Sequence, residues 1–158
     1  MNLIRPQEAF PTPDTWFSLV VSYGETDAMG VVYYGNYPHW FERARGQFMR
    51  ERGMSYAKVE DMGLRLPVRE MIVRYLAPAR YDEEILVRAG ISDWGRASMS
   101  FAYQVYGSPD RTKPLCLGAT QHACVDRTGK PVALPDWLKD ICANDTGHTH
   151  PRIPPQDR

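Results

Sequence analysis

Hydrophobic residues change their spacing along this chain, and each change marks a predicted element. The segment 16–25 (WFSLVVSYGE) is apolar, contains β-branched residues and predicts a strand. Beyond it the spacing becomes helical, and the apolar positions that share one face are Tyr37, Phe41, Ala44 and Phe48. This pattern predicts one amphipathic helix at about 37–52, with Asn36 at its N-cap and its apolar face directed at a sheet.

After a short helical segment that ends before Gly63, the apolar period becomes two. Turn-forming segments such as SPDRTKP (108–114) separate four predicted strands, which lie at 66–78, 82–94, 97–107 and 115–126. A short helix follows at 134–142. The order strand, helix, four strands, helix predicts an α+β domain in which an antiparallel sheet packs against the long helix.

Composition narrows the class of protein. A chain of 158 residues predicts one domain at 16–142, with loosely ordered ends at 1–15 and 143–158. Because 19 basic residues balance 19 acidic ones, we expect neither a nucleic-acid nor a membrane partner. The three cysteines form no disulfide pattern, and the N-terminus has no apolar leader region, so we expect free thiols and a cytoplasmic location.

Most common chemical motifs are absent from the sequence. It contains no glycine-rich phosphate loop, no G-x-S-x-G elbow and no clustered metal-ligand motif. What remains is Asp27, which lies between the first strand and the long helix, close to Gly30. Backbone N–H groups at a helix N-terminus can hold an oxyanion, and a nearby carboxylate can attack a carbonyl or activate water. Asp27 is therefore a candidate for acyl transfer, although the same pattern also fits a solvated connector.

The segment 25–45 (ETDAMGVVYYGNYPHWFERAR) resembles the signature of the hotdog-fold acyl-CoA thioesterases of the 4-hydroxybenzoyl-CoA thioesterase family. The resemblance covers about residues 17–140 and implies an antiparallel β-sheet wrapped around one long central α-helix. It implies that Asp27 is the catalytic nucleophile or general base and that the Tyr34 N–H polarises the thioester carbonyl. By the same resemblance Gly30 forms a tight turn at the substrate-binding site, and Arg96 and Ser98 contact the CoA phosphates.

The implied reaction is hydrolysis of an acyl-CoA to a free acid and CoA. It needs no metal or bound cofactor, because CoA is part of the substrate. The acyl group stays open between an aromatic group such as hydroxybenzoyl and a short or medium aliphatic chain. Alternatives are a non-catalytic hotdog module that binds acyl-CoA or an acyl carrier and, less favoured because no histidine lies in a suitable loop, a hydroxyacyl-thioester dehydratase.

The resemblance also implies a homodimer that assembles into a homotetramer. The strand at 97–107 is expected to form an exposed edge that a second copy would cover. Two further acids, Glu25 and Glu42, are interpreted as structural. Glu25 is expected to be a solvated loop acid or a local hydrogen-bond partner, and Glu42 an ion-pair residue.

Overall fold

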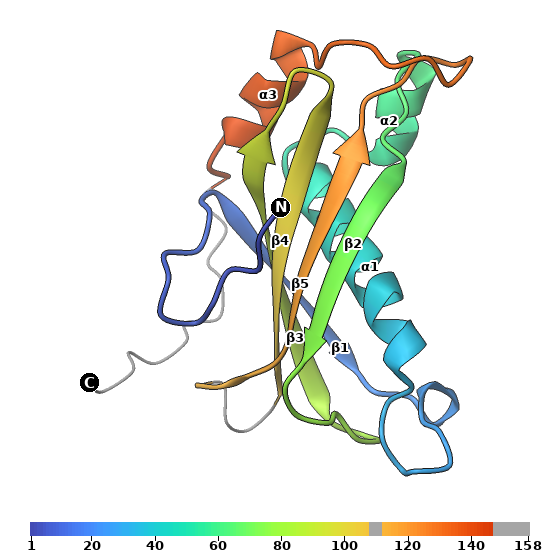
Figure 1. Cartoon of the computed structure of the whole chain (residues 1–158), viewed down its shortest axis with the longest axis vertical. Coiled ribbons are helices and arrows are strands. Elements are labelled where there is room, and N and C mark those ends of the chain that lie inside the picture. The colour runs from blue at the N-terminus through green and yellow to red at the C-terminus, as the bar shows by residue number, and fades with distance from the viewer. Residues whose placement is uncertain (108–111, 147–158) are drawn as a thin grey trace.

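Helix α1 (Tyr37–Glu51) lies against one face of an antiparallel sheet that wraps around it (Figure 1). The computed structural model describes residues 1–107 and 112–146, so most of the predicted 108–114 connection and the end of the C-terminal tail lie outside the described residues. The remaining elements are β1 (Asp14–Val20), the 3-10 turns η1 (Tyr23–Glu25) and η2 (Tyr34–Asn36), α2 (Tyr56–Asp61), β2 (Val68–Tyr75), β3 (Glu84–Trp94), β4 (Ser98–Gly107), β5 (Pro114–Ala123) and α3 (Asp136–Ala143). The predicted α+β arrangement and element order are confirmed.

The strand order in the sheet is β1-β3-β4-β5-β2. The prediction that residues 97–107 form an exposed edge is wrong, because β4 pairs with β3 on one side and β5 on the other and is buried along nearly all its length. The edges are β1 and β2, and β2 is exposed at almost every position. Alternation along a sequence indicates which face a residue occupies, but it carries no information about strand order.

Two predicted boundaries are corrected where the chain passes from β1 to α1. The strand expected at 16–25 ends at Val20, because the chain turns through η1. Asn36 stands before α1 but does not cap it, since its backbone is already helical (φ −79°, ψ −23°). Its side-chain Nδ2 instead donates to the carbonyl oxygen of Glu25 at 2.8 Å. The polar side chain thus joins the loop to the helix.

The core lies between α1 and the sheet. The apolar face predicted for the helix is confirmed, since Phe41, Ala44 and Phe48 are fully buried. Phe41 stacks on Tyr103 of β4 with ring centroids 4.4 Å apart. Gly118 of β5 lets the helix approach closely, because a Cβ there would lie 2.4 Å from the Phe41 ring. In the described part of the chain, no helix is both long and apolar enough to cross a membrane.

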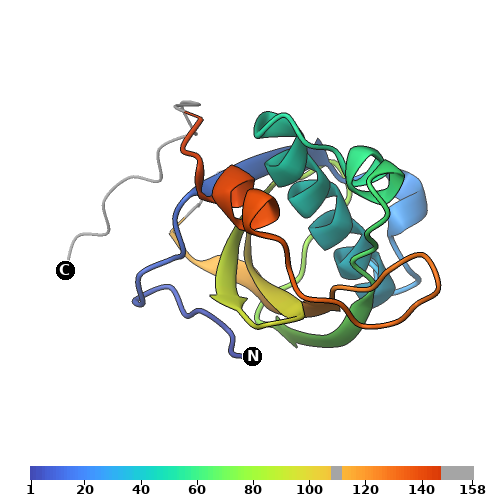
Figure 2. The ribbon, with the colours of Figure 1, turned by 90° about the horizontal axis from the view of Figure 1, so that it is seen from above.

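The N-terminal segment covers the opposite face of the sheet (Figure 2). Gln104 alternates with the core residue Tyr103 and donates through Nε2 to the carbonyl oxygen of Ile4 at 3.1 Å. Phe10 is buried, and the Arg88 guanidinium lies 4.3 Å from the centre of its ring. The first residues, expected to be loosely ordered, therefore shield the outer surface of the strands.

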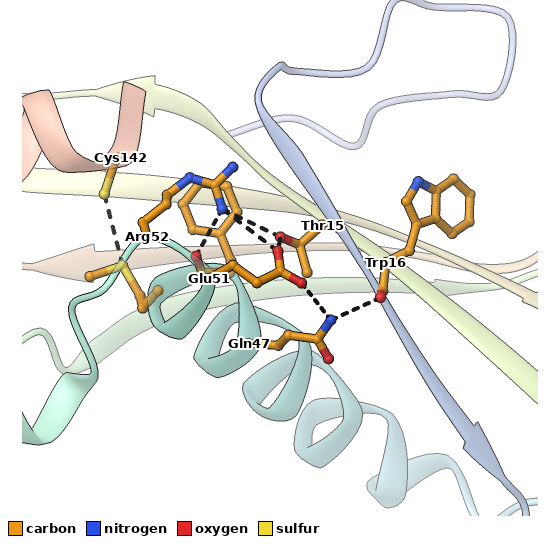
Figure 3. Close-up of polar contacts among 8 residues, drawn as sticks. Thr15, Trp16, Gln47, Glu51, Arg52 and Cys142 are labelled. Carbon is orange, nitrogen blue, oxygen red and sulfur yellow. Dashed lines mark hydrogen bonds and ion pairs between the residues drawn. The ribbon is translucent and has the colours of Figure 1, made fainter. Parts of the chain in front are cut away.

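A buried polar network ties the end of α1 to β1 (Figure 3). The Glu51 carboxylate accepts hydrogen bonds from Thr15 Oγ1 at 2.5 Å and from Gln47 Nε2 at 2.7 Å. The side chain of Arg52 is 1% exposed, and its Nη1 lies 4.0 Å from Glu51 Oε2. Nη1 also donates to the Phe48 carbonyl oxygen at 2.8 Å. Burial lowers the pKa of Arg52, and the negative charge of Glu51 offsets part of that decrease. The network therefore holds a cation inside the protein.

Candidate active site

Asp27 opens a tight turn between η1 and η2. Its carbonyl oxygen accepts from Gly30 N at 2.9 Å, and its own N–H donates to Val31 O at 2.9 Å. Gly30 has φ +74°, a left-handed conformation that favours glycine, so the tight turn expected there is present. The Asp27 side chain is fixed by the same turn, because Oδ1 accepts from Met29 N at 2.8 Å.

A cavity of about 310 Å³ lies beside this turn. Asp27 and Tyr34 line it from the loop, and Tyr75, Leu76 and Pro78 line it from the end of β2 and the residues that follow. Its volume is near the lower limit of about 300 Å³ for small-molecule sites, and such sites combine apolar walls with a few polar groups. The two residues predicted for the chemistry thus border one cavity.

The backbone of Tyr34 is held from two sides. It is the first residue of η2, where an N–H has no acceptor within its own helix. Its carbonyl oxygen accepts from Tyr75 Oη at 2.9 Å, which anchors η2 to β2. Because η2 runs directly into α1, the Tyr34 N–H also lies at the positive end of the helix dipole. The Tyr34 N–H is therefore a candidate donor for an anionic oxygen.

Glu25 is more than the solvated acid or local partner expected from the sequence. Its Oε2 accepts from the backbone N–H of Ser22 at 2.8 Å, and its Oε1 accepts from Trp40 Nε1 of α1 at 2.9 Å. Its carbonyl oxygen accepts from Tyr33 N at 2.9 Å and from Asn36 Nδ2 at 2.8 Å. Partial burial alone would raise the pKa of Glu25, but the hydrogen bonds from Trp40 and Ser22 outweigh it, so the pKa is lowered.

Arg96 and Ser98 lie at the opposite end of the sheet from Asp27. The antiparallel pairing of β1 with β3 places Val20 opposite Glu84, so the 21–36 loop lies beside the start of β3. The turn that carries Arg96 follows the end of β3, far from that loop (Figure 1). Gly95 N donates to Ser98 O at 2.7 Å and closes this turn. Asp27, Gly30 and Tyr34 are therefore brought together within one chain, whereas these two residues are not.

Comparison with known proteins points to one family. A sequence profile described as the thioesterase-like superfamily matches residues 21–141, which include the Asp27 turn, α1 and all strands except β1. An acyl-CoA thioesterase of Haemophilus influenzae is 32% identical over 125 residues, which is 78% of this chain and 90% of that protein. An acyl-CoA thioester hydrolase of Escherichia coli is 33% identical over 116 residues, with 73% and 85% covered.

A solved structure agrees with the sequence relatives. The DHNA-CoA thioesterase from Staphylococcus aureus superimposes with a TM-score of 0.73 and 30% identity. The match covers 80% of this chain and 87% of that one. The sheet and the central helix are therefore shared with a protein whose substrate is a CoA thioester.

Proposed function

This chain belongs to the thioesterase-like superfamily, and on that premise we propose that it hydrolyses the thioester bond of an acyl-CoA, releasing a free acid and CoA. Its fold is the hotdog fold, an antiparallel sheet around one central helix. The observation that carries the proposal is one cavity bordered by Asp27 and by Tyr34, which stands at the start of a helical segment.

Two routes are open to Asp27. In the first, its carboxylate attacks the thioester carbon, the C–S bond breaks to release CoA, and water hydrolyses the resulting anhydride. In the second, Asp27 takes a proton from a water molecule whose oxygen attacks the same carbon, and CoA leaves as the thiolate or thiol. Both routes place negative charge on the carbonyl oxygen. The Tyr34 N–H would stabilise that oxyanion, an effect worth about 2.7–4 kcal/mol for one donor.

The residues that line the cavity indicate which acyl groups it suits. Tyr75 and Leu76 are 45% and 50% exposed in the single chain and form a largely apolar surface with Pro78. Such a surface suits a single aromatic ring or a short or medium aliphatic chain better than a charged acyl group. A panel of both substrate types is therefore the appropriate test.

The proposed assembly is a homodimer formed along β2. This edge strand carries Val68, Met71 and Ile72, each more than 40% exposed, and an unpaired apolar edge is normally covered. A two-fold pairing of β2 with its copy is antiparallel, so it places opposite ends of the two sheets side by side. The CoA phosphates could then reach Arg96 and Ser98 of a second copy. Assembly into tetramers and a cytoplasmic location stay predictions.

The decisive experiment measures thiol release from aromatic and aliphatic acyl-CoAs by the native chain and by Asp27→Asn. Asparagine keeps an oxygen for the Met29 N–H but can neither attack nor accept a proton, so kcat is expected to fall by about 10²–10⁴-fold. Asp140→Asn, at an exposed position on α3, is the matched control and should retain full activity. Undiminished hydrolysis by Asp27→Asn would remove Asp27 from the mechanism. Binding of acyl-CoA by the native chain without hydrolysis would indicate a binding module.

A further inference from the structure

The loop that carries Asp27 has a narrow neck, and Glu25 lies at that neck. Tyr33 N donates to the carbonyl oxygen of Glu25, and the next pair, Thr26 and Val32, forms an antiparallel bridge. Asp27 lies inside the loop, two residues after Glu25. Tyr34 lies just outside the loop, directly after Tyr33. The separation between the Asp27 carboxylate and the Tyr34 N–H is therefore set where these two chain segments meet.

The Glu25 side chain fixes this neck to α1. Trp40 is fully buried, and its indole N–H donates to Glu25 Oε1 at 2.9 Å. A buried donor that loses its acceptor costs about 1–3 kcal/mol, so the indole constrains where the carboxylate can lie. The indole also packs against Tyr37, with ring centroids 4.7 Å apart, and Tyr37 lines the cavity. One side chain thus connects the neck, the helix and the cavity wall.

The second oxygen of the same carboxylate fixes the entry to the loop. Glu25 Oε2 accepts from both the backbone N–H and the hydroxyl of Ser22, at 2.8 and 2.9 Å. Hydrogen bonds to an ionised acceptor are roughly twice as strong as neutral ones. A glutamine could supply only one acceptor oxygen in place of two, because its other terminal atom is a donor. The arrangement therefore requires a carboxylate at position 25.

We propose that Glu25 is a positioning residue for thioester hydrolysis, which holds the Asp27 carboxylate and the Tyr34 N–H at the separation that the reaction needs. The inference rests on the function proposed above. It assigns no contact between Glu25 and the substrate. Its effect is transmitted through the neck of the loop and through Trp40.

The first test compares Glu25→Gln and Glu25→Ala with the native chain. A misplacement of about 1 Å at reacting groups can cost about 100-fold in rate, so we expect kcat to fall by about 10- to 100-fold, more for alanine than for glutamine. KM should change less than kcat, since Tyr75, Leu76 and Pro78 line the cavity from outside the loop that Glu25 holds. Thermal unfolding of each variant, measured beside Asp140→Asn, establishes the folded fraction in the assay.

The second test uses the partner of Glu25. Trp40→Phe keeps an aromatic ring but removes the N–H, and its kcat should fall together with that of Glu25→Gln. Because both changes break the same link, the double variant should lose no more than the more impaired single variant. The Trp40 indole N–H resonance should also move in Glu25→Gln, whereas the other three tryptophan resonances should stay in place.

These outcomes separate the two proposals. If the native chain hydrolyses thioesters, Asp27→Asn is inactive and folded Glu25→Gln retains kcat within about twofold, the positioning role is overturned and the proposed function stands. Multiplicative losses in the double variant would overturn it as well. If the native chain hydrolyses no thioester, the proposed function itself fails.

Discussion

Glu51→Gln is expected to destabilise the protein by isolating a buried cation. Glutamine matches glutamate in size and can still accept from the Thr15 hydroxyl, but it has one acceptor oxygen in place of two. The change therefore removes the negative charge together with the acceptor for Gln47 Nε2. Arg52 cannot compensate by turning to water, because its side chain is 1% exposed and its Nε has no hydrogen-bond partner in the described part of the chain. The guanidinium would keep the Phe48 carbonyl and the Phe48 ring, whose centre lies 3.6 Å away.

The magnitude follows from these contacts. Breaking a buried ion pair by removing one partner costs about 3–5 kcal/mol. The Glu51–Arg52 separation is 4.0 Å, and Asp14 and Asp145 also contribute negative charge near Arg52, so we expect a loss at or below the low end of that range. A loss of about 2–3 kcal/mol corresponds to a fall in Tm of roughly 4–12 °C for a chain of this size.

Urea unfolding followed by circular dichroism measures this loss, and a second variant provides the control. Arg52→Met combined with Glu51→Gln removes both charges, so no buried cation is left without its partner. The double variant should therefore be more stable than Glu51→Gln alone. A Glu51→Gln protein within about 0.5 kcal/mol of the native chain, or strict additivity in the double variant, would refute the reasoning.

Three further predictions concern the core. Gly118→Ala should cost about 1–3 kcal/mol in thermal unfolding, because the added Cβ would lie 2.4 Å from the Phe41 ring; an unchanged Tm would contradict the close approach of α1. Burial lowers the pKa of His122 from 6.5 to about 4. The contribution of neutral His122 to stability is therefore present above pH 6.5 and is lost as the pH falls towards 4. His122→Gln should flatten the dependence of Tm on pH across that interval. Burial raises the pKa of all three cysteine thiols, so the native chain should react with Ellman's reagent far more slowly than the urea-unfolded chain, and rapid labelling of the native chain would refute this.

Sequence patterns predicted the elements of this fold better than their arrangement. The helix at Tyr37–Glu51 was predictable, because one amphipathic stripe with Phe41 and Phe48 determines both its existence and its buried face. The position of the strand at 97–107 in the sheet was not. Gln104 and Tyr106 share a strand face with polar or small residues that would tolerate water, yet both are buried. Gln104 bonds to Ile4 of the N-terminal segment and Tyr106 packs against Trp16 of β1.

In the candidate site too, local placement was predictable and long-range contacts were not. Asp27, Gly30 and Tyr34 are close in sequence, so their joint placement around one turn could be predicted from spacing and resemblance. Glu25 could not be assigned its partners, because Trp40 lies 15 residues later and only the entry angle of α1 brings its indole to the loop. The distance of Arg96 from this loop likewise depends on strand register, which no local pattern records.

The edge position of β2 has a consequence for inhibition. Its residue Tyr75 both lines the cavity and donates to the Tyr34 carbonyl oxygen, so whatever pairs with the free side of this strand acts on the proposed oxyanion donor through one hydroxyl. If the dimer proposed along β2 forms, activity per chain should depend on dilution, with a lag when concentrated enzyme is diluted below the dissociation constant of that dimer. An extended peptide that adds to β2 as an extra strand would compete with the second copy of that dimer. It would inhibit hydrolysis without resembling the substrate.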